Sequence, residues 1–145
     1  MPTEIGNVYD LTWRGRPPHM LDLDVPIWYR FLDKYGSAFL ALHYDCLLGG
    51  PFHTPQQEAD PMWRMWRYNT SKRADAIANL SSEVWIIEVS ASPGLRAVGQ
   101  LLVYKSLWLE DPKILKPIQL VLVAAQIDAD LAGACSASGI QIYIV

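Results

Sequence analysis

The fold is decided by the stretch ADAIANLSSEVWIIEVSASPGLRAVGQLLVY, residues 74–104. It begins with two β-prone runs, residues 74–80 and residues 84–89, which are separated by two serines and a glutamate. Valine, isoleucine and tryptophan are enriched in strands, and a short polar break between two such runs is typical of a hairpin. The stretch therefore predicts a β-hairpin followed directly by another element.

That next element is predicted to be a helix. Pro93 and Gly94 open it, and apolar residues recur at helical spacing as far as about Trp108. The apolar stripe expected to face the core consists of Leu95, Val98, Leu102 and Leu109.

The rest of the chain after this helix continues the alternation. Residues 118–125, IQLVLVAA, are typical of a strand that is buried on both faces. A short helix is expected over residues 128–136, and a closing strand over residues 140–145. The order of hairpin, helix, strand, helix and strand predicts an α/β fold, in which helices flank a mixed central sheet.

The N-terminal half is less regular. Residues 1–24 show little periodicity and predict an extended N-terminal arm, which either grips a neighbouring subunit or is a disordered terminus. The segments expected between the arm and the hairpin are a helix from Asp24 to Gly36, a strand over residues 37–48, a loop over residues 49–61 and one or two helical turns over residues 62–68. We therefore expect a single domain over residues 25–145.

The composition describes a folded domain of modest negative charge. Of the 145 residues, 51% are hydrophobic and 19% charged, and the net charge is −3, which excludes a disordered chain and weakly disfavours a DNA-binding protein, although a local basic patch remains compatible with it. Cys46 and Cys135 lack zinc-ligand spacing, so we expect two reduced, packed thiols, with a disulfide as the alternative. No signal core or apolar run of membrane-spanning length occurs, so we expect an intracellular protein at synthesis, cytoplasmic or later incorporated in a virion, with no membrane partner.

Glu88 is a carboxylate in the middle of an otherwise apolar strand. Because burying an unpaired charge costs several kcal/mol, it needs a metal ion, a basic partner or an exposed cleft. Asp75 lies on the preceding strand, and two carboxylates that meet between strands can hold a hard divalent cation such as Mg²⁺. The alternative is a structural ion pair of Glu88 with Lys72, Arg73 or Arg96.

A resemblance supports the first interpretation. Asp75, the run IIEVS at residues 86–90 and the run PGLRAVGQLLVY at residues 93–104 resemble the core of the PD-(D/E)xK nuclease superfamily, which has the restriction-endonuclease-like fold. The resemblance covers residues 72–145. It implies that Asp75 and Glu88 are the two catalytic acids and bind Mg²⁺, and that Gln100 and Tyr104 face the site from the following helix.

The sequence departs from that family at Ser90, where the family pattern has a lysine. A neutral hydroxyl cannot supply the positive charge that helps to position and activate the attacking water. In an active member of the family the charge would have to come from elsewhere, and Arg96 or Lys72 could provide it.

A basic and aromatic segment, WRMWRYNTSKR, spans residues 63–73. Its cations could lie along a phosphate backbone while its aromatic rings stack on bases. The nucleic-acid-binding residues expected in that case are Arg64, Arg67, Lys72 and Arg73. Two alternatives remain, namely a helix with its tryptophans in the core and its arginines in solvent, and a contact between protein subunits.

Two functions are therefore expected. In the first, the chain is a catalytically impaired nuclease-like domain that acts as a structural component of an assembly, for example of a phage particle, as a homo-oligomer or with other protein subunits. The missing lysine, the acidic pI and the N-terminal arm favour it. In the second, the chain is a Mg²⁺-dependent deoxyribonuclease, either an endonuclease or an exonuclease, that hydrolyses phosphodiester bonds of DNA.

Overall fold

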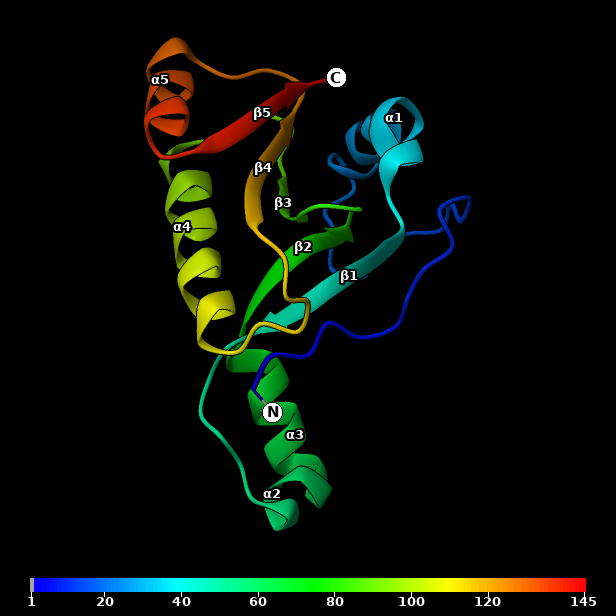
Figure 1. Ribbon diagram of the computed structural model, residues 1–145, viewed down its shortest axis with the longest axis vertical. Helices are drawn as coiled ribbons and strands as arrows, with labels where there is room; N and C mark the ends of the chain where they lie inside the picture. Colours follow the sequence, from blue (N-terminus) through cyan, green and yellow to red (C-terminus); the bar gives the residue numbers. More distant parts are fainter. Residues whose placement is uncertain (1) are drawn as a thin grey trace.

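A five-stranded sheet with the order β1-β2-β3-β4-β5 forms the centre of the computed structural model, which describes residues 2–145 (Figure 1). Strand β2 runs antiparallel to both of its neighbours, β1 and β3, whereas β3, β4 and β5 run parallel. The strands are β1 (Ala41–Leu48), β2 (Lys72–Asn79), β3 (Val84–Val89), β4 (Ile118–Ala124) and β5 (Ile140–Ile144). The predicted α/β fold with a mixed central sheet is thereby confirmed.

Helices cover both faces of this sheet. The helices of the described residues are α1 (Val25–Tyr35), with a 3₁₀ turn η1 (Gly36–Ala38), α2 (Pro55–Ala59), α3 (Pro61–Thr70), α4 (Leu95–Glu110) and α5 (Ala129–Ala137). The helix α1 lies on one side of the sheet, and α4 and α5 lie on the other (Figure 1). Side chains alternate along a strand, so Trp85 and Ile87 pack toward α1 while Ile86 packs toward α4.

The N-terminal segment lies along the outer edge of β1. Glu4 exchanges two backbone hydrogen bonds with Leu47, each of 2.9 Å, and the Tyr9 N–H donates to the Leu42 carbonyl at 2.8 Å. The predicted extended arm is therefore packed against its own domain in the described residues. There it covers an edge strand that would otherwise expose unpaired backbone groups.

The buried face of α4 differs from the predicted one. Its core side chains are Ala97, Leu101, Tyr104 and Trp108, whereas Leu95, Leu102 and Leu109 of the predicted stripe are exposed and Val98 is half-buried. Both sets have helical spacing, so periodicity alone could not choose between them. The small Ala97 allows close approach to the sheet, and the observed rotation brings Tyr104 beneath β3.

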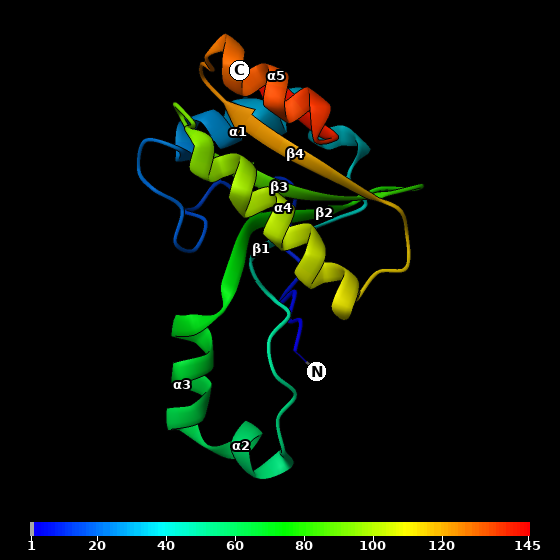
Figure 2. The same cartoon turned by 90° about the vertical axis from the view of Figure 1, so that its left-hand side faces the viewer.

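The segment between β1 and β2 forms a helical hairpin that projects away from the sheet (Figure 2). A loop was predicted over residues 49–61, but Thr54 and Gln57 form a capping box that starts α2. Asp60 then caps α3 by accepting from the Met62 N–H. This second helix is longer than the one or two turns that the sequence predicted.

The two cysteines are free and buried, as expected. Burial raises the pKa of the Cys46 thiol well above its ordinary value. Among residues 2–145, no helix has the length and apolarity that crossing a membrane requires.

Candidate active site

Asp75 and Glu88 lie where β2 and β3 separate. The two strands pair from Asn79 opposite Val84 to Ala76 opposite Ile87, and no further. Beyond this point the Val89 N–H donates to Asp75 Oδ2 at 2.8 Å, so a side chain replaces the missing backbone partner. Strand alternation directs Glu88 to the α4 side of the sheet, the side on which Ile86 is buried. Strand β2 changes face at Asp75, since Ala74 packs toward α4 and Ala76 toward α1, and Asp75 lines the same pocket as Glu88.

The two carboxyl groups are held in an environment that opposes their ionisation. Burial raises the pKa of Glu88, and the neighbouring charge of Asp75 raises it further. Burial also raises the pKa of Asp75, although the hydrogen bond from Val89 acts in the opposite direction. The Oε2 atom of Glu88 is buried and has no hydrogen-bond partner in the protein.

No ion pair neutralises this charge within the described residues. The arginines and lysines that form ion pairs there do so with other carboxylates. The alternative in which Glu88 forms a structural ion pair with Lys72, Arg73 or Arg96 is therefore wrong. Tertiary structure keeps these cations at the rim of the site or outside it, whereas sequence spacing left all three within reach.

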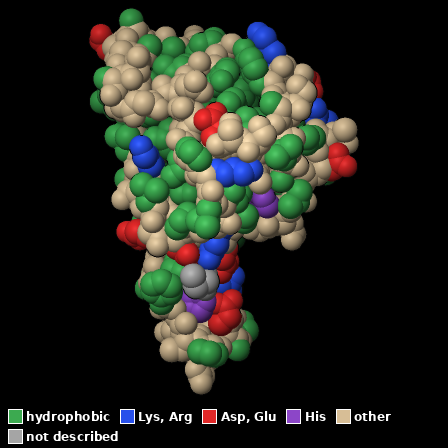
Figure 3. All heavy atoms as spheres, in the orientation of Figure 1, with side chains coloured by type: hydrophobic (Ala, Val, Ile, Leu, Met, Phe, Trp, Pro, Cys, Tyr) green, Lys and Arg blue, Asp and Glu red, His purple; other side chains and the backbone are tan. Residues whose placement is uncertain are grey.

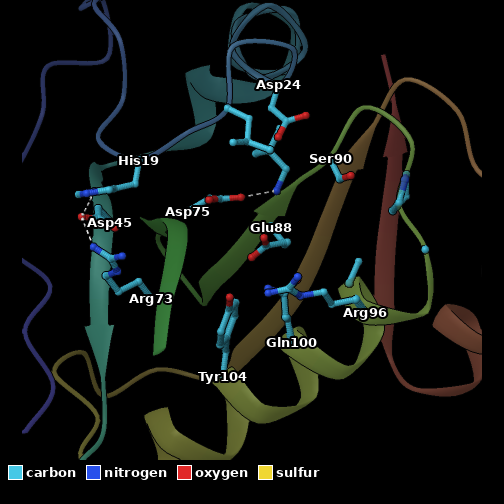
Figure 4. Close-up of a pocket in the computed structure, with 15 residues that line it drawn as sticks. His19, Asp24, Asp45, Arg73, Asp75, Glu88, Ser90, Arg96, Gln100 and Tyr104 are labelled. Carbon is cyan, nitrogen blue, oxygen red and sulfur yellow. Dashed lines mark hydrogen bonds and ion pairs between the residues drawn. The ribbon is translucent and has the colours of Figure 1, made fainter. Parts of the chain in front are cut away.

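A pocket of about 530 Å³ opens over the acidic pair. Arg96, Gln100 and Tyr104 line it from successive turns of α4, and their side chains extend toward Glu88 (Figure 4). Tyr104 is nearly fully buried, and its burial together with the charge of Glu88 raises the pKa of its hydroxyl. The helix thus supplies a guanidinium, an amide and a phenol to one wall of the pocket.

Ser90 also lines the pocket, directly after the end of β3. Of the two candidate replacements for the missing lysine, Arg96 lines the same pocket, whereas Lys72 is exposed and lines a smaller depression between α3 and α4. The cation available to the acidic pair from the α4 wall is therefore Arg96.

Three ionisable residues of the pocket lining were not predicted as site residues, namely His19, Asp24 and Asp45. The helix was expected to start at Asp24, but the Asp24 side chain makes no capping bond to α1 and instead accepts from the Ala91 N–H at 2.9 Å. This contact ties the N-terminal segment to the loop that carries Ser90. An aspartate is common at a helix start, so its position gave no signal of a site. Nothing in the local sequence marked His19 or Asp45.

The basic segment does not form one continuous phosphate-binding surface. Arg64 is engaged by both carboxylate oxygens of Glu4, at 2.7 and 2.9 Å. Arg67 is only 2% exposed and donates to the Gly49 carbonyl, so it is not placed to meet a phosphate backbone. The alternative with buried tryptophans and solvated arginines is also wrong, because Trp66 is 52% exposed. Of the four predicted nucleic-acid-binding cations, Arg73 is the one that lines the pocket.

The donor set of the acidic pair fits a hard divalent cation. Residues 2–145 contain no cluster of three or more histidine, cysteine, aspartate and glutamate side chains arranged for a metal ion. Mg²⁺ does not need such a cluster, because it is commonly held by one or two carboxylates together with water and substrate phosphates. The buried Glu88 Oε2, which has no partner, and the adjacent Asp75 carboxylate match this requirement.

Comparison with protein-family models, with curated proteins and with solved structures finds no match to this chain. Its function therefore has to be inferred from its own residues and contacts.

Proposed function

We propose that this chain is a metal-dependent nuclease of the PD-(D/E)xK type that hydrolyses phosphodiester bonds of DNA. The observation that carries the proposal is the pair of buried carboxylates, Asp75 and Glu88, which adjoin each other under an open pocket and form no ion pair with a lysine or arginine of residues 2–145. Two such groups destabilise a fold when both are ionised. A ligand of opposite charge, bound between the two carboxylates, would offset this cost.

Asp75 and Glu88 are the residues that would hold Mg²⁺. The bound ion would supply Lewis-acid polarisation of a phosphoryl oxygen and a lowered pKa of bound water. The Val89 N–H fixes the orientation of Asp75. The buried Tyr104 phenol limits the positions that the Glu88 carboxylate can adopt.

The α4 wall supplies the remaining groups. Arg96 carries the positive charge that Ser90 lacks, and a guanidinium matches the geometry of two phosphate oxygens. The Gln100 amide can donate to a phosphate oxygen or to the attacking water. Because Arg96 approaches from a helix and not from β3, its charge enters the pocket from a different direction than the family lysine would.

A cleavage assay tests the proposal. Supercoiled plasmid and linear duplex DNA are incubated with the protein in Mg²⁺, in Mn²⁺ and in EDTA. Wild type should cleave only with metal, and Asp75→Asn and Glu88→Gln should lose about a hundredfold or more of the rate. Glu110→Gln, at the exposed end of α4, removes the same charge outside the pocket and should cleave like wild type. A wild type that is as inert as the two site variants in both metals would overturn the proposal.

One observation favours the structural function as a second candidate. The projecting helix α3 exposes Met62, Met65 and Trp66, at 80%, 65% and 52%, and Figure 3 shows hydrophobic side chains at the surface of this projecting part. Tryptophan and methionine are enriched in protein interfaces. In this candidate function the pocket is inactive because Ser90 replaces lysine, and the chain acts as a subunit of an assembly such as a phage particle. A mass measurement that finds only monomer at high concentration would count against self-assembly.

A further inference from the structure

A second group of polar side chains stands on the pocket wall opposite Arg96. In Figure 4, His19, Asp45 and Arg73 lie on one side, Ser90 and Arg96 on the other, and Asp75 and Glu88 between them. His19 Nδ1 lies 2.8 Å from Asp45 Oδ2, and Arg73 Nη1 lies 3.6 Å from the same oxygen. The Tyr68 hydroxyl also donates to Asp45 Oδ2. Three side chains from three separate segments thus converge on one carboxylate, two through hydrogen bonds and Arg73 through an ion pair.

The backbone is strained where this group forms. Among the described residues, His19 and Asp45 are the non-glycine residues with positive φ, at 61° and 51°. Such conformations cost of order 1 kcal/mol or more each and persist where the surroundings impose them, often at functional sites. The side chains of His19 and Asp45 are hydrogen-bonded to each other, so both unusual backbone conformations contribute to the same contact.

Strand β1 changes face at Asp45. Tyr44 packs into the core beneath α1, whereas Cys46 packs toward α4. The pairing of β1 with β2 continues on both sides but omits the position at which Asp45 would face Asp75. This local reversal turns the Asp45 side chain into the pocket, next to the acidic pair.

Arg73 is held by this group and stays partly exposed to the pocket. Its guanidinium lies over the Tyr68 ring, 4.6 Å from the ring centroid, its buried Nη1 atom faces Asp45, and its side chain keeps 25% of its surface exposed where it lines the pocket. The ring and Asp45 therefore fix the orientation of a cation whose exposed part faces the pocket. A guanidinium fixed in this way is preorganised for a phosphate group, which accepts two parallel hydrogen bonds.

We propose that Arg73 and His19, held by Asp45 and Tyr68, form a phosphate-binding subsite separate from the Asp75 and Glu88 site. Its ligand is a backbone phosphate of DNA that flanks the phosphate placed over the acidic pair. This deepens the proposed nuclease function and rests on it for the identity of the substrate. Arg73 and His19 on one wall of the pocket, and Arg96 on the opposite wall, then contact successive phosphates of one DNA strand. These phosphates lie on either side of the acidic pair.

DNA binding in EDTA tests the subsite without requiring a metal ion or cleavage. The probe is a short fluorescently labelled duplex, titrated with protein at several salt concentrations and followed by anisotropy. Arg73→Gln should weaken binding about tenfold and reduce the slope of log K against log salt by about one. Lys105→Gln removes the same charge from the exposed surface of α4 and should leave the affinity within about twofold of wild type.

The Asp45→Asn variant distinguishes two explanations of DNA binding. In one, Asp45 orients the cations of the subsite, and in the other, DNA is held by charge attraction alone. The substitution removes a negative charge from the pocket, so charge attraction alone predicts tighter DNA binding. If Asp45 orients Arg73 and His19, binding should instead weaken, by about threefold or more, and His19→Gln should weaken it in the same direction. Thermal melting of each variant verifies that it is folded, and Arg73→Gln carries the test if Asp45→Asn does not fold.

The possible outcomes distinguish this subsite from the nuclease proposal. Competition by inorganic phosphate that depends on Arg73 would support the phosphate chemistry. Tighter binding by folded Asp45→Asn, equal binding by Arg73→Gln and Lys105→Gln, or a wild type that does not bind the duplex would each overturn the subsite. Binding that depends on Arg73 in a protein that never cleaves DNA would overturn the nuclease proposal alone.

Discussion

Glu88 adjoins Asp75 inside the protein, on the next strand, and the pair has no lysine or arginine partner within residues 2–145. The arrangement stores unfavourable electrostatic free energy in the metal-free protein, because each ionised carboxylate is both desolvated and repelled by the other. In the proposed nuclease, stability, metal binding and catalysis are therefore coupled through these two side chains.

The first prediction concerns the stability of the metal-free protein as a function of pH. Both acids have a folded-state pKa above their unfolded values of about 4. At these two groups the folded protein then binds more protons than the unfolded protein, so their contribution to the free energy of unfolding is fully present below about pH 4 and is lost as the pH rises through the folded pKa values. Thermal melting in EDTA between pH 5 and pH 9 should show a falling Tm. The fall should be smaller in Glu88→Gln and unchanged in Glu110→Gln.

The second prediction is that Mg²⁺ reverses this loss at alkaline pH. An ion that binds only the folded state stabilises it by about 2.7 kcal/mol at a concentration one hundred times its Kd. Melting at pH 8 should therefore show a Tm that rises with Mg²⁺ in wild type. The rise should be absent in Asp75→Asn and in Glu88→Gln. An equal rise in these variants would place the ion elsewhere in the protein.

Part of this site could be predicted from the sequence, because strand alternation is a local rule. The position of Glu88 in β3 fixes its face as soon as the hairpin is identified, whereas the face of Asp75 depends on the change of face in β2 between Ala74 and Ala76. The face of α4 could not be predicted, since Leu95 and Leu102 are as regularly spaced as Leu101 and Trp108. Packing beneath the sheet decided between the two sets.

The residues that the sequence did not reveal depend on tertiary contacts. Asp45 enters the pocket because β1 changes face at a positive φ, which no strand pattern predicts. His19 reaches it from the N-terminal segment, which follows the edge of β1. Arg67 differs from the prediction in the opposite direction. Its place in a basic and aromatic segment predicted a surface residue that binds nucleic acid, but its side chain is buried in the fold.

The third prediction follows from the burial of Arg67. Its guanidinium donates to the Gly49 carbonyl and the Ser71 hydroxyl, and Gly50 packs directly against it. Arg67→Ala should lower the free energy of unfolding by about 2–4 kcal/mol, because it leaves a cavity and a carbonyl without its donor. Lys72→Ala, at an exposed position, should change it by less than about 0.5 kcal/mol. Urea denaturation measures both, and equal midpoints would show that Arg67 is not a structural residue.

The fourth prediction separates the role of Arg96 from metal binding. Arg96 lines the pocket but makes no ion pair with the acids, so its removal should leave the Tm increase caused by Mg²⁺ close to that of wild type. The cleavage rate should fall, by about a hundredfold, because the charge that stabilises the transition state is lost. Loss of the Mg²⁺ effect in Arg96→Gln would instead make Arg96 a structural support of the acidic pair.

The last prediction concerns Ser90, where a lysine can be introduced beside Glu88. The position lines an open pocket, so the longer side chain has room, and its ammonium would lie on the same face of the chain as the Glu88 carboxylate. A cation there lowers the pKa of both acids and stabilises the folded protein at pH 8 in EDTA, by about 1 kcal/mol or more. If Arg96 supplies the charge that the family lysine would, Ser90→Lys should restore cleavage to Arg96→Gln by about tenfold or more. Ser90→Gln, which lengthens the side chain without charge, should restore nothing. A double variant that gains stability but not cleavage would mean that Arg96 and a lysine at this position are not interchangeable.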